Sequence, residues 1–253
     1  MTKLEVILAK ALGLAAFACT WELASRSVGD YWVPGIGQVA TRLWTQLLAG
    51  RLLADLAATS QLLLAGTSIG AVCGGAVACM LRLSPRLDTL MQPFMTAVMS
   101  IPKLGLVPLL VLWFGTGWTP KVMLVALTVL FIVFSLTYAG LVTVNARLVM
   151  TARVFGASSL QVTRHVVIPS VLPFIFTGLQ VALPWAVSAA LVAEYLAAKV
   201  GIGHSIEEAR QLSDSVGVYC GIVLATVLVL LCNGVLAVVR KLAIKVQPRS
   251  DAP

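Results

Sequence analysis

One short stretch of the chain, residues 145–173, combines basic, small and proline residues in a way that suits binding to a protein partner. Its basic residues and prolines surround a central glycine: Arg147, Arg153, Gly156, Arg164, His165, Pro169 and Pro173. Arginine offers five N–H donors in a planar fork that fits carboxylate and carbonyl groups. Long apolar stretches flank the segment on both sides. We therefore predict a docking element that faces a soluble partner.

The middle of this segment predicts two short helices joined at a bend. Gly156 and Ala157 carry little side-chain bulk, so a partner can approach the main chain closely, and glycine tolerates the backbone angles of a bend. Ser158 and Ser159 are residues of the type that caps the start of a helix. The alternative is a plain amphipathic helix lying on anionic lipid, which would not require a glycine at the bend.

Two charged residues fall within apolar stretches, where an ionised group is costly and commonly functional. Lys103 follows Pro102 and can either attract an anion or extend its ammonium along an apolar stem to water. Glu194 lies late in another apolar stretch, where it can line a pathway or hold a gate near the outer face. Alternatively, Glu194 lies at the membrane interface and pairs with Lys199. Both alternatives stay open for each residue.

The chain lacks the patterns of common catalytic and metal sites. It contains no GxxxxGK[ST] phosphate-binding loop, so it cannot hydrolyse ATP alone. An intramembrane protease would need a nucleophile paired with a base, but no GxSxG occurs, and His165 and His204 fall on opposite sides of the topology derived below. The five cysteines lie in apolar stretches without metal-ligand spacing. We expect neither catalysis nor a cofactor or metal bound by this chain.

Composition places the elements that carry these residues in a lipid bilayer. The chain has 253 residues, of which 59% are hydrophobic and 11% charged, and its mean hydropathy is +0.97. Soluble domains carry about 25% charged residues, so too few are present to cover a water-exposed surface. The net charge of +8 comes from Lys and Arg residues that flank apolar stretches, which argues against nucleic-acid binding. We predict one transmembrane domain over residues 1–253.

Six apolar stretches are long enough to cross a bilayer, which takes about 20 helical residues. We predict an all-α membrane protein with spans near 5–25, 57–81, 88–114, 119–143, 169–198 and 217–240. Prolines in the third and fifth spans predict kinks or short breaks, most clearly at residues 101–103. A secondary transporter working alone would show matching broken helices in two inverted halves, and the sequence has none.

The distribution of charge orients these spans. Most Lys and Arg residues lie on one side of the predicted spans, and most acidic residues lie on the other. The positive-inside rule then places both termini and the loop at 145–168 in the cytoplasm. The outer loops fall near 26–56 and 199–216. Within the first, residues 39–48 have the apolar spacing of a helix that lies along the membrane surface.

The spacing in the basic segment matches a family signature. Ala152, Gly156 four residues later and Pro169 thirteen residues after that resemble the cytoplasmic motif of bacterial ABC importer permeases. That motif reads Glu-Ala-Ala, three residues, Gly, nine residues, Ile, any residue, Leu-Pro. The chain departs from it at Met150 and Thr151, which replace the Glu and the first Ala. The resemblance is to the nitrate, taurine and alkanesulfonate group.

Further matches to this family follow in order along nearly the whole chain. They are Trp21-Glu22-Leu23-Ala24, Val33-Pro34 to Val39, Ile101-Pro102-Lys103-Leu104 to Pro108-Leu109, Leu112-Trp113-Phe114-Gly115-Thr116-Gly117, Val192-Ala193-Glu194-Tyr195 and Gly201-Ile202-Gly203. Each is short, but their order and spacing together carry the resemblance.

The resemblance implies a type I importer permease in the bacterial cytoplasmic membrane, acting as a homodimer. It implies two ATPase subunits, which would hold ATP and magnesium, and an external solute-binding protein. The expected solute is small and anionic, with a pyrimidine- or flavin-type nutrient as the alternative. The implied ATPase-coupling residues are Ala152, Arg153, Gly156, Ala157, Ser158, Arg164 and Pro169. Those expected along the translocation pathway are Ser100, Pro102, Lys103 and Glu194.

Overall fold

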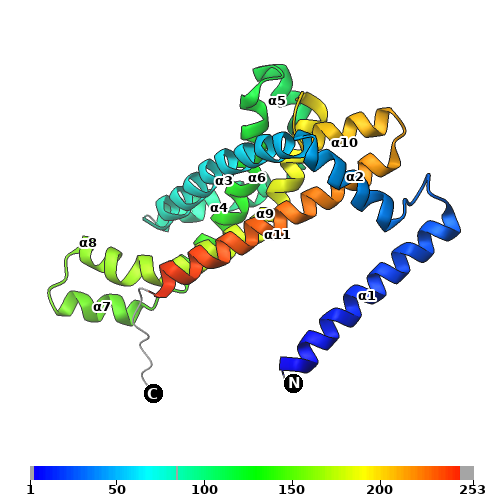
Figure 1. The fold of residues 1–253 in the computed structure, drawn as a ribbon. Helices are drawn as coiled ribbons and strands as arrows, with labels where there is room; N and C mark the ends of the chain where they lie inside the picture. The colour runs from blue at the N-terminus through cyan, green and yellow to red at the C-terminus, as the bar shows by residue number, and fades with distance from the viewer. Residues whose placement is uncertain (1–2, 84, 246–253) are drawn as a thin grey trace.

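The computed structural model describes residues 3–83 and 85–245, and every regular element within these ranges is a helix (Figure 1). The elements are α1 (Lys3–Val28), α2 (Ile36–Leu48), α3 (Arg51–Leu83), α4 (Pro85–Met99), η1 (Lys103–Leu106), α5 (Val107–Phe114), α6 (Trp118–Val142), α7 (Ala146–Val154), α8 (Ser159–Val162), η2 (Thr163–Val167), α9 (Ile168–Ala197), α10 (Ile202–Gln211) and α11 (Ser215–Lys245). The predicted all-α membrane fold is confirmed.

Four helices in the described ranges are long and apolar enough to cross a membrane. They run over Arg51–Arg82, Trp118–Val142, Ser159–Ala197 and Ser215–Ala243. A fifth candidate is the pair Arg86–Met99 and Lys103–Phe114, which is bent by 78° at its break. The break lies where Pro102 was expected to interrupt the third span. In contrast, α9 stays one helix through Pro173 and Pro184, where we had expected kinks or breaks.

The predicted first span is a helix, but α1 stands apart from the rest of the molecule (Figure 1). Its 26 residues rise about 39 Å at 1.5 Å per residue, enough to cross a bilayer, although it is not among the four apolar spans. Trp21 fixes its C-terminal end, because its indole donates a hydrogen bond of 2.9 Å to the carbonyl of Pro34. Six crossings therefore stay a prediction.

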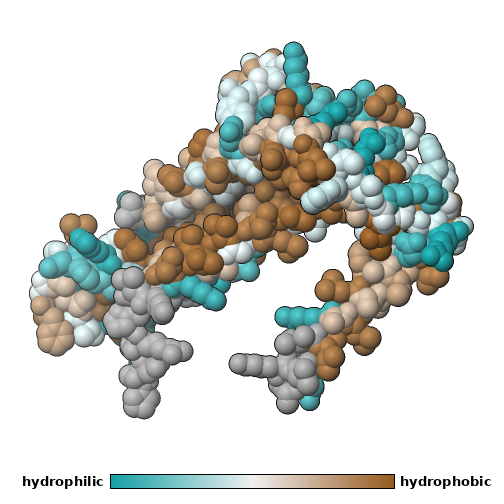
Figure 2. All heavy atoms as spheres, viewed as in Figure 1, coloured by the Kyte–Doolittle hydropathy of each residue, from teal (hydrophilic) through white to brown (hydrophobic). Residues whose placement is uncertain are grey.

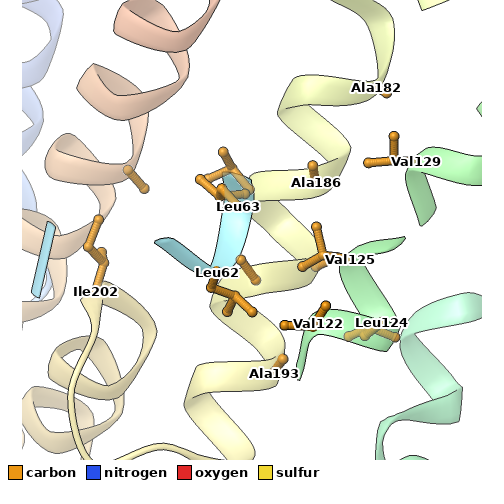
Figure 3. Packing of buried hydrophobic residues seen from close by; sticks show 14 of the residues in the cluster. Leu62, Leu63, Val122, Leu124, Val125, Val129, Ala182, Ala186, Ala193 and Ile202 are labelled. Atoms are coloured by element: carbon orange, nitrogen blue, oxygen red, sulfur yellow. The ribbon is translucent and has the colours of Figure 1, made fainter. Parts of the chain in front are cut away.

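The core lies where α3, α6 and α9 pack together (Figure 3). Leu124, Val125, Val129 and Val133 of α6 are fully buried there. Figure 2 shows the apolar surface along the body of the molecule, with polar surface gathered towards its ends. This distribution suits helices that pack on one side and face lipid on the other.

Three glycines of α3 let it approach α6 closely. A Cβ atom at Gly66 would lie 2.6 Å from the side chain of Val125, and one at Gly70 would lie 2.5 Å from the carbonyl oxygen of Ala126. At Gly74 it would lie 2.4 Å from the carbonyl oxygen of Leu130. Small residues at such spacing bring helix backbones together in membranes, where van der Waals contact drives association.

Both loops that were predicted to lie outside the membrane contain a helix. The predicted surface helix at 39–48 is present as α2, which begins at Ile36. The loop at 199–216 was expected only as a polar connection, but most of it forms α10. Figure 1 places α2, α5 and α10 in the upper part of the molecule, and α7, α8 and the start of α1 in the lower part.

Candidate functional site

Residues 145–168, which we call the docking loop, form two short helices that meet at a glycine. The side chain of Asn145 starts α7 by accepting a hydrogen bond of 2.9 Å from the N–H of Arg147. The helix ends at Gly156, whose φ is +81°, a conformation that glycine adopts without strain. The N–H groups of Gly156 and Ala157 bond to the carbonyls of Arg153 and Ala152, at 2.9 and 3.0 Å. This is a Schellman end.

Ser158 starts the next helix through a reciprocal pair of hydrogen bonds. Its hydroxyl accepts from the N–H of Gln161 at 3.3 Å, and its own N–H donates to the side-chain carbonyl of Gln161 at 2.8 Å. Such a capping box satisfies two N–H groups that the helix itself cannot pair. Ser159, which we also expected to cap, is instead the first residue of α8. The predicted two-helix bend is confirmed.

A π-helical turn, η2, forms the last part of the docking loop and leads directly into α9. It contains Arg164 and His165, and the Nδ1 atom of His165 lies 3.0 Å from the carbonyl oxygen of Gln161. Pro169 follows in the first turn of α9 and has no N–H to offer the carbonyl of His165. Isolated π-turns of this kind are frequently functional. Here, the turn lies between α8 and the membrane span α9.

Apolar side chains are exposed on the docking loop. Val154, Phe155 and Leu160 are 80%, 85% and 78% exposed, and Arg153 and Arg164 are also exposed. A hollow of about 420 Å³ at the bend is lined by Ala152, Phe155, Gly156, Ala157, Gln161, Val162, His165 and Val166. The sequence prediction rested on the basic residues and missed the apolar ones. Val154 and Phe155, directly before Gly156, were the available signal.

A second polar site lies at the C-terminal end of α9, where Glu194 is almost fully buried. One carboxylate oxygen, Oε2, accepts hydrogen bonds from the Thr59 hydroxyl at 3.0 Å and from the Gly203 N–H at 2.9 Å. The same hydroxyl of Thr59 accepts from the N–H of Ile202 at 3.0 Å. Glu194 and Thr59 therefore hold the first turn of α10 against α9 and α3.

Asp55 completes this arrangement from one turn earlier on α3. Its carboxylate accepts from the N–H of Gly201 at 2.9 Å and from the hydroxyl of Ser205 at 2.5 Å. Carboxylates at a helix N-terminus are stabilised by unpaired N–H groups and by the helix dipole. We call Asp55, Thr59 and Glu194, with the N–H groups of residues 201–203, the polar clamp.

The polar clamp requires glycine at two positions. Gly201 has a φ of +130°, and a Cβ atom there would meet the Glu194 carboxylate at 2.5 Å. A Cβ atom at Gly203 would meet the carbonyl oxygen of Leu191 at 2.3 Å. The sequence prediction singled out Glu194 but not Asp55 or Thr59. In the described part of the chain, Glu194 forms no ion pair with Lys199, the partner that one alternative had given it.

Ion pairs nearer the protein surface surround the polar clamp. Arg42 of α2 bonds to Asp214 at 2.9 Å, and Arg51 of α3 bonds to Glu208 of α10. Within α10, two hydrogen bonds of 2.7 Å from Arg210 to Glu207 lower the pKa of that carboxyl to about 2. Water screens ion pairs near the surface, so each contributes little to stability. The buried clamp therefore dominates the fixing of α10.

The break in the third span places Ser100, Pro102 and Lys103 together, away from the polar clamp. The Lys103 ammonium donates to the carbonyl of Met99 at 3.1 Å and lies 5.3 Å from the centre of the Phe131 ring. The Ser100 hydroxyl donates to the carbonyl of Thr96 at 3.0 Å, and Pro102 precedes η1. Within the described ranges, no hydrogen bond or ion pair links these residues to Glu194.

The fold is similar to that of a solved importer. One chain of a structure titled "Inward facing conformations of the MetNI methionine ABC transporter" superposes with a TM-score of 0.65 and 16% sequence identity. The match covers 81% of this chain and 99% of that chain. At this identity, the likeness concerns the fold alone.

Two curated relatives are closer in sequence. The putative aliphatic sulfonates transport permease protein SsuC of Escherichia coli is 34% identical over 213 residues, covering 82% of this chain and 80% of that protein. The formylaminopyrimidine transport permease protein ThiX of Halalkalibacterium halodurans is 30% identical over 209 residues, covering 82% and 83%. The family model described as "Binding-protein-dependent transport system inner membrane component" matches residues 66–245. The chain belongs to this family of ABC importer permeases.

Proposed function

We propose that two copies of this chain form the translocation pathway for a small anionic solute, and that the docking loop couples the pathway to ATP hydrolysis by partner subunits. An external solute-binding protein would deliver the solute, and two ATPase subunits would hold ATP and magnesium. The single observation that carries the coupling proposal is the exposed apolar surface of the docking loop.

That surface is unfavourable in water unless a protein covers it. Val154, Phe155 and Leu160 are each at least 78% exposed, and burial of one large apolar side chain contributes about 1.5–3 kcal/mol. The hollow at the bend offers a partner side chain a recess between α7 and α8. The exposed guanidinium groups of Arg153 and Arg164 would add hydrogen bonds to partner carboxylates or carbonyls.

The orientation proposed here places the docking loop and both termini in the cytoplasm. The excess of Lys and Arg residues on that side supports it. Cysteine labelling in intact cells tests it in a chain whose own cysteines have been replaced. Gly37→Cys and Leu212→Cys should react with an impermeant maleimide, because both positions are exposed at the outer end. Ser159→Cys should react only after permeabilisation, and reaction in intact cells would reverse the topology.

The proposed solute is a sulfonate. The SsuC relative supports this choice, and so does Lys103. An ammonium has three N–H donors; one bonds to Met99, a second direction faces the Phe131 ring, and no carboxylate forms an ion pair with Lys103 in the described ranges. Ser100 and Pro102 would shape the break that exposes this charge. A formylaminopyrimidine-type solute is the second candidate, favoured by the ThiX relative.

Uptake by the full transporter in proteoliposomes decides between the two solutes. This chain, its co-purified ATPase and the binding protein should accumulate a labelled alkanesulfonate when ATP is supplied. Lys103→Gln should lower that uptake about tenfold or more, the effect of losing roughly 1.4 kcal/mol of charge stabilisation, while Lys103→Arg retains most of it. Accumulation of the pyrimidine alone would overturn the sulfonate proposal, and the absence of any co-purified ATPase would overturn the coupling proposal.

A further inference from the structure

A groove between the cytoplasmic ends of α9 and α11 has a composition that nothing in the transport cycle requires. It encloses about 320 Å³ and is lined by Phe176, Gln180, Leu236, Ala237, Arg240 and Lys241. Phe176 is buried, Leu236 and Arg240 are half-buried, and Lys241 is exposed. The groove thus joins an apolar floor to two positive charges.

Helix geometry explains how the two halves of the groove are arranged. Leu236 and Arg240 are four residues apart on α11, as are Ala237 and Lys241, so these pairs lie on one face of the helix. The basic pair lies one turn closer to the end of α11 than the apolar pair. An occupant therefore meets apolar side chains deeper in the membrane and positive charge nearer the water.

The positive charge of the groove is not neutralised within the chain. No lining residue is acidic, and neither Arg240 nor Lys241 forms an ion pair in the part of the chain that the structure describes. By contrast, Arg26, Arg42, Arg51 and Arg210 each form an ion pair with a carboxylate at the opposite end of the molecule. Cations near the end of a helix complement its dipole, but the dipole alone does not account for an apolar groove beneath them.

We propose that this groove binds an anionic phospholipid, with the phosphate at Arg240 and Lys241 and an acyl chain along Leu236 and Phe176. Basic pockets between helices on the cytoplasmic side suit such headgroups. The apolar floor disfavours a free phosphate or another soluble anion, which would gain nothing from it. The amide of Gln180 can donate a further hydrogen bond to a headgroup oxygen. The lipid proposal rests on the cytoplasmic orientation proposed above for its leaflet, but not on any solute.

Lipid retention by the purified full chain tests this site without any transport assay. The protein is delipidated in detergent, and binding of phosphatidylglycerol or phosphatidylcholine is then followed by native mass spectrometry. The parent should retain phosphatidylglycerol at least tenfold more strongly than phosphatidylcholine. Arg240→Gln with Lys241→Gln should abolish that preference. The matched control, Arg82→Gln with Arg86→Gln, removes two exposed arginines from outside the groove and should retain it.

A second variant tests the apolar half of the groove. Ala237→Trp fills the floor without changing the charge, so it should lower phosphatidylglycerol retention severalfold. Equal retention of both lipids by the parent would overturn the proposal, as would full retention by the double Gln variant. Loss of ATPase co-purification or of dimers in that variant, with lipid retention intact, would assign the groove to a protein contact. Failure of sulfonate uptake would leave the lipid result unaffected.

Discussion

The polar clamp and the docking loop place their side chains in opposite environments. In the clamp, the charged side chains of Asp55 and Glu194 are buried and hydrogen-bonded, whereas in the loop, the apolar side chains of Val154 and Phe155 are exposed. Each arrangement is unfavourable by itself, because buried charge needs partners and exposed apolar surface needs cover. The clamp finds its partners within the chain, whereas the proposed coupling would bring cover for the loop from another protein.

This contrast separates two consequences of substitution. A change in the polar clamp should lower the stability of the chain, because it leaves buried donors unpaired. A change on the docking loop should lower affinity for the ATPase with little effect on stability, since its side chains contact few others in the chain. The following substitutions test this separation.

The largest effect is expected from Glu194→Ala. It leaves the Gly203 N–H and the Thr59 hydroxyl without their acceptor, at about 1–3 kcal/mol for each buried donor left unpaired. Thermal unfolding in detergent should shift clearly downwards, and transport should fall with it, while ATPase binding per folded molecule stays near the parent value. Glu208→Ala, which removes a carboxylate of α10 whose side chain is 43% exposed, is the control. Unchanged unfolding in Glu194→Ala would mean that the clamp does not fix α10.

Gly156→Leu should act mainly on partner binding. A Cβ atom at this position meets no atom of the chain within 4 Å, but a φ of +81° is a backbone conformation that leucine rarely adopts. Overpacking of a tight contact costs about 1–3 kcal/mol, or roughly five- to 150-fold in affinity for the ATPase. Co-purification at matched expression measures the loss, and insertion of the spans should be unchanged.

Gly156→Asn distinguishes the effect of side-chain size from that of backbone strain at the same position, because asparagine tolerates a positive φ. If Asn binds the ATPase like the parent and Leu does not, side-chain branching and backbone strain are the cause. If both fail, close approach of the partner is the cause. Parental binding and transport by Gly156→Leu would show that the docking loop is not the coupling element.

Phe155→Ala should weaken ATPase binding about tenfold, near the lower end of the roughly 1.5–3 kcal/mol that burial of an apolar side chain contributes. Unfolding of the chain alone should not change, because Phe155 is 85% exposed. Leu212→Ala is the matched control, as Leu212 is 73% exposed at the outer end. An equal loss in both variants would show a general effect of lost apolar surface.

The smallest effect is expected from Ser158→Ala. Loss of a serine N-cap costs about 1 kcal/mol of helix stability, and it is confined here to the start of α8. Hydrogen exchange at the N–H of Gln161, which loses its acceptor, should become faster, and ATPase binding should fall only severalfold. Ser159→Ala should leave both unchanged. Slower exchange, or loss of thermal stability of the whole chain, would contradict the separation.

Local signals explain why the docking loop could be predicted from the sequence. Gly156 and Ser158 determine their own surroundings through backbone angle and capping, so the two helices and the bend between them follow from the order of residues. Pro102 similarly predicted the break in the third span. The exposed side of the loop was missed, because apolar residues in a short helix do not reveal whether they face the chain or a partner.

The polar clamp could not be predicted in this way. Its contacts join Asp55 to Gly201 and Thr59 to Glu194, separated by 146 and 135 residues. The charge of Glu194 in an apolar span marked it as unusual, but only tertiary structure shows which donors surround it. The helix α10 could not be predicted for the same reason. Its polar sequence suited an outer loop, and only the tertiary structure shows that buried carboxylates hold its first turn.

The close contact that the glycines allow between α3 and α6 should make the two helices move together as one rigid unit. Because Gly70 and Gly74 lie against main-chain carbonyls of α6, neither helix can slide without a collision. At one end of this helix pair, α6 ends at Val142 and the chain continues into the docking loop. At the other end, α3 carries Asp55 and Thr59. In the proposed coupling, a rigid helix pair of this kind would convert a small displacement at one membrane face into a tilt at the other. The rigidity of the α3–α6 pair would determine how much of the displacement at the docking loop reaches α10.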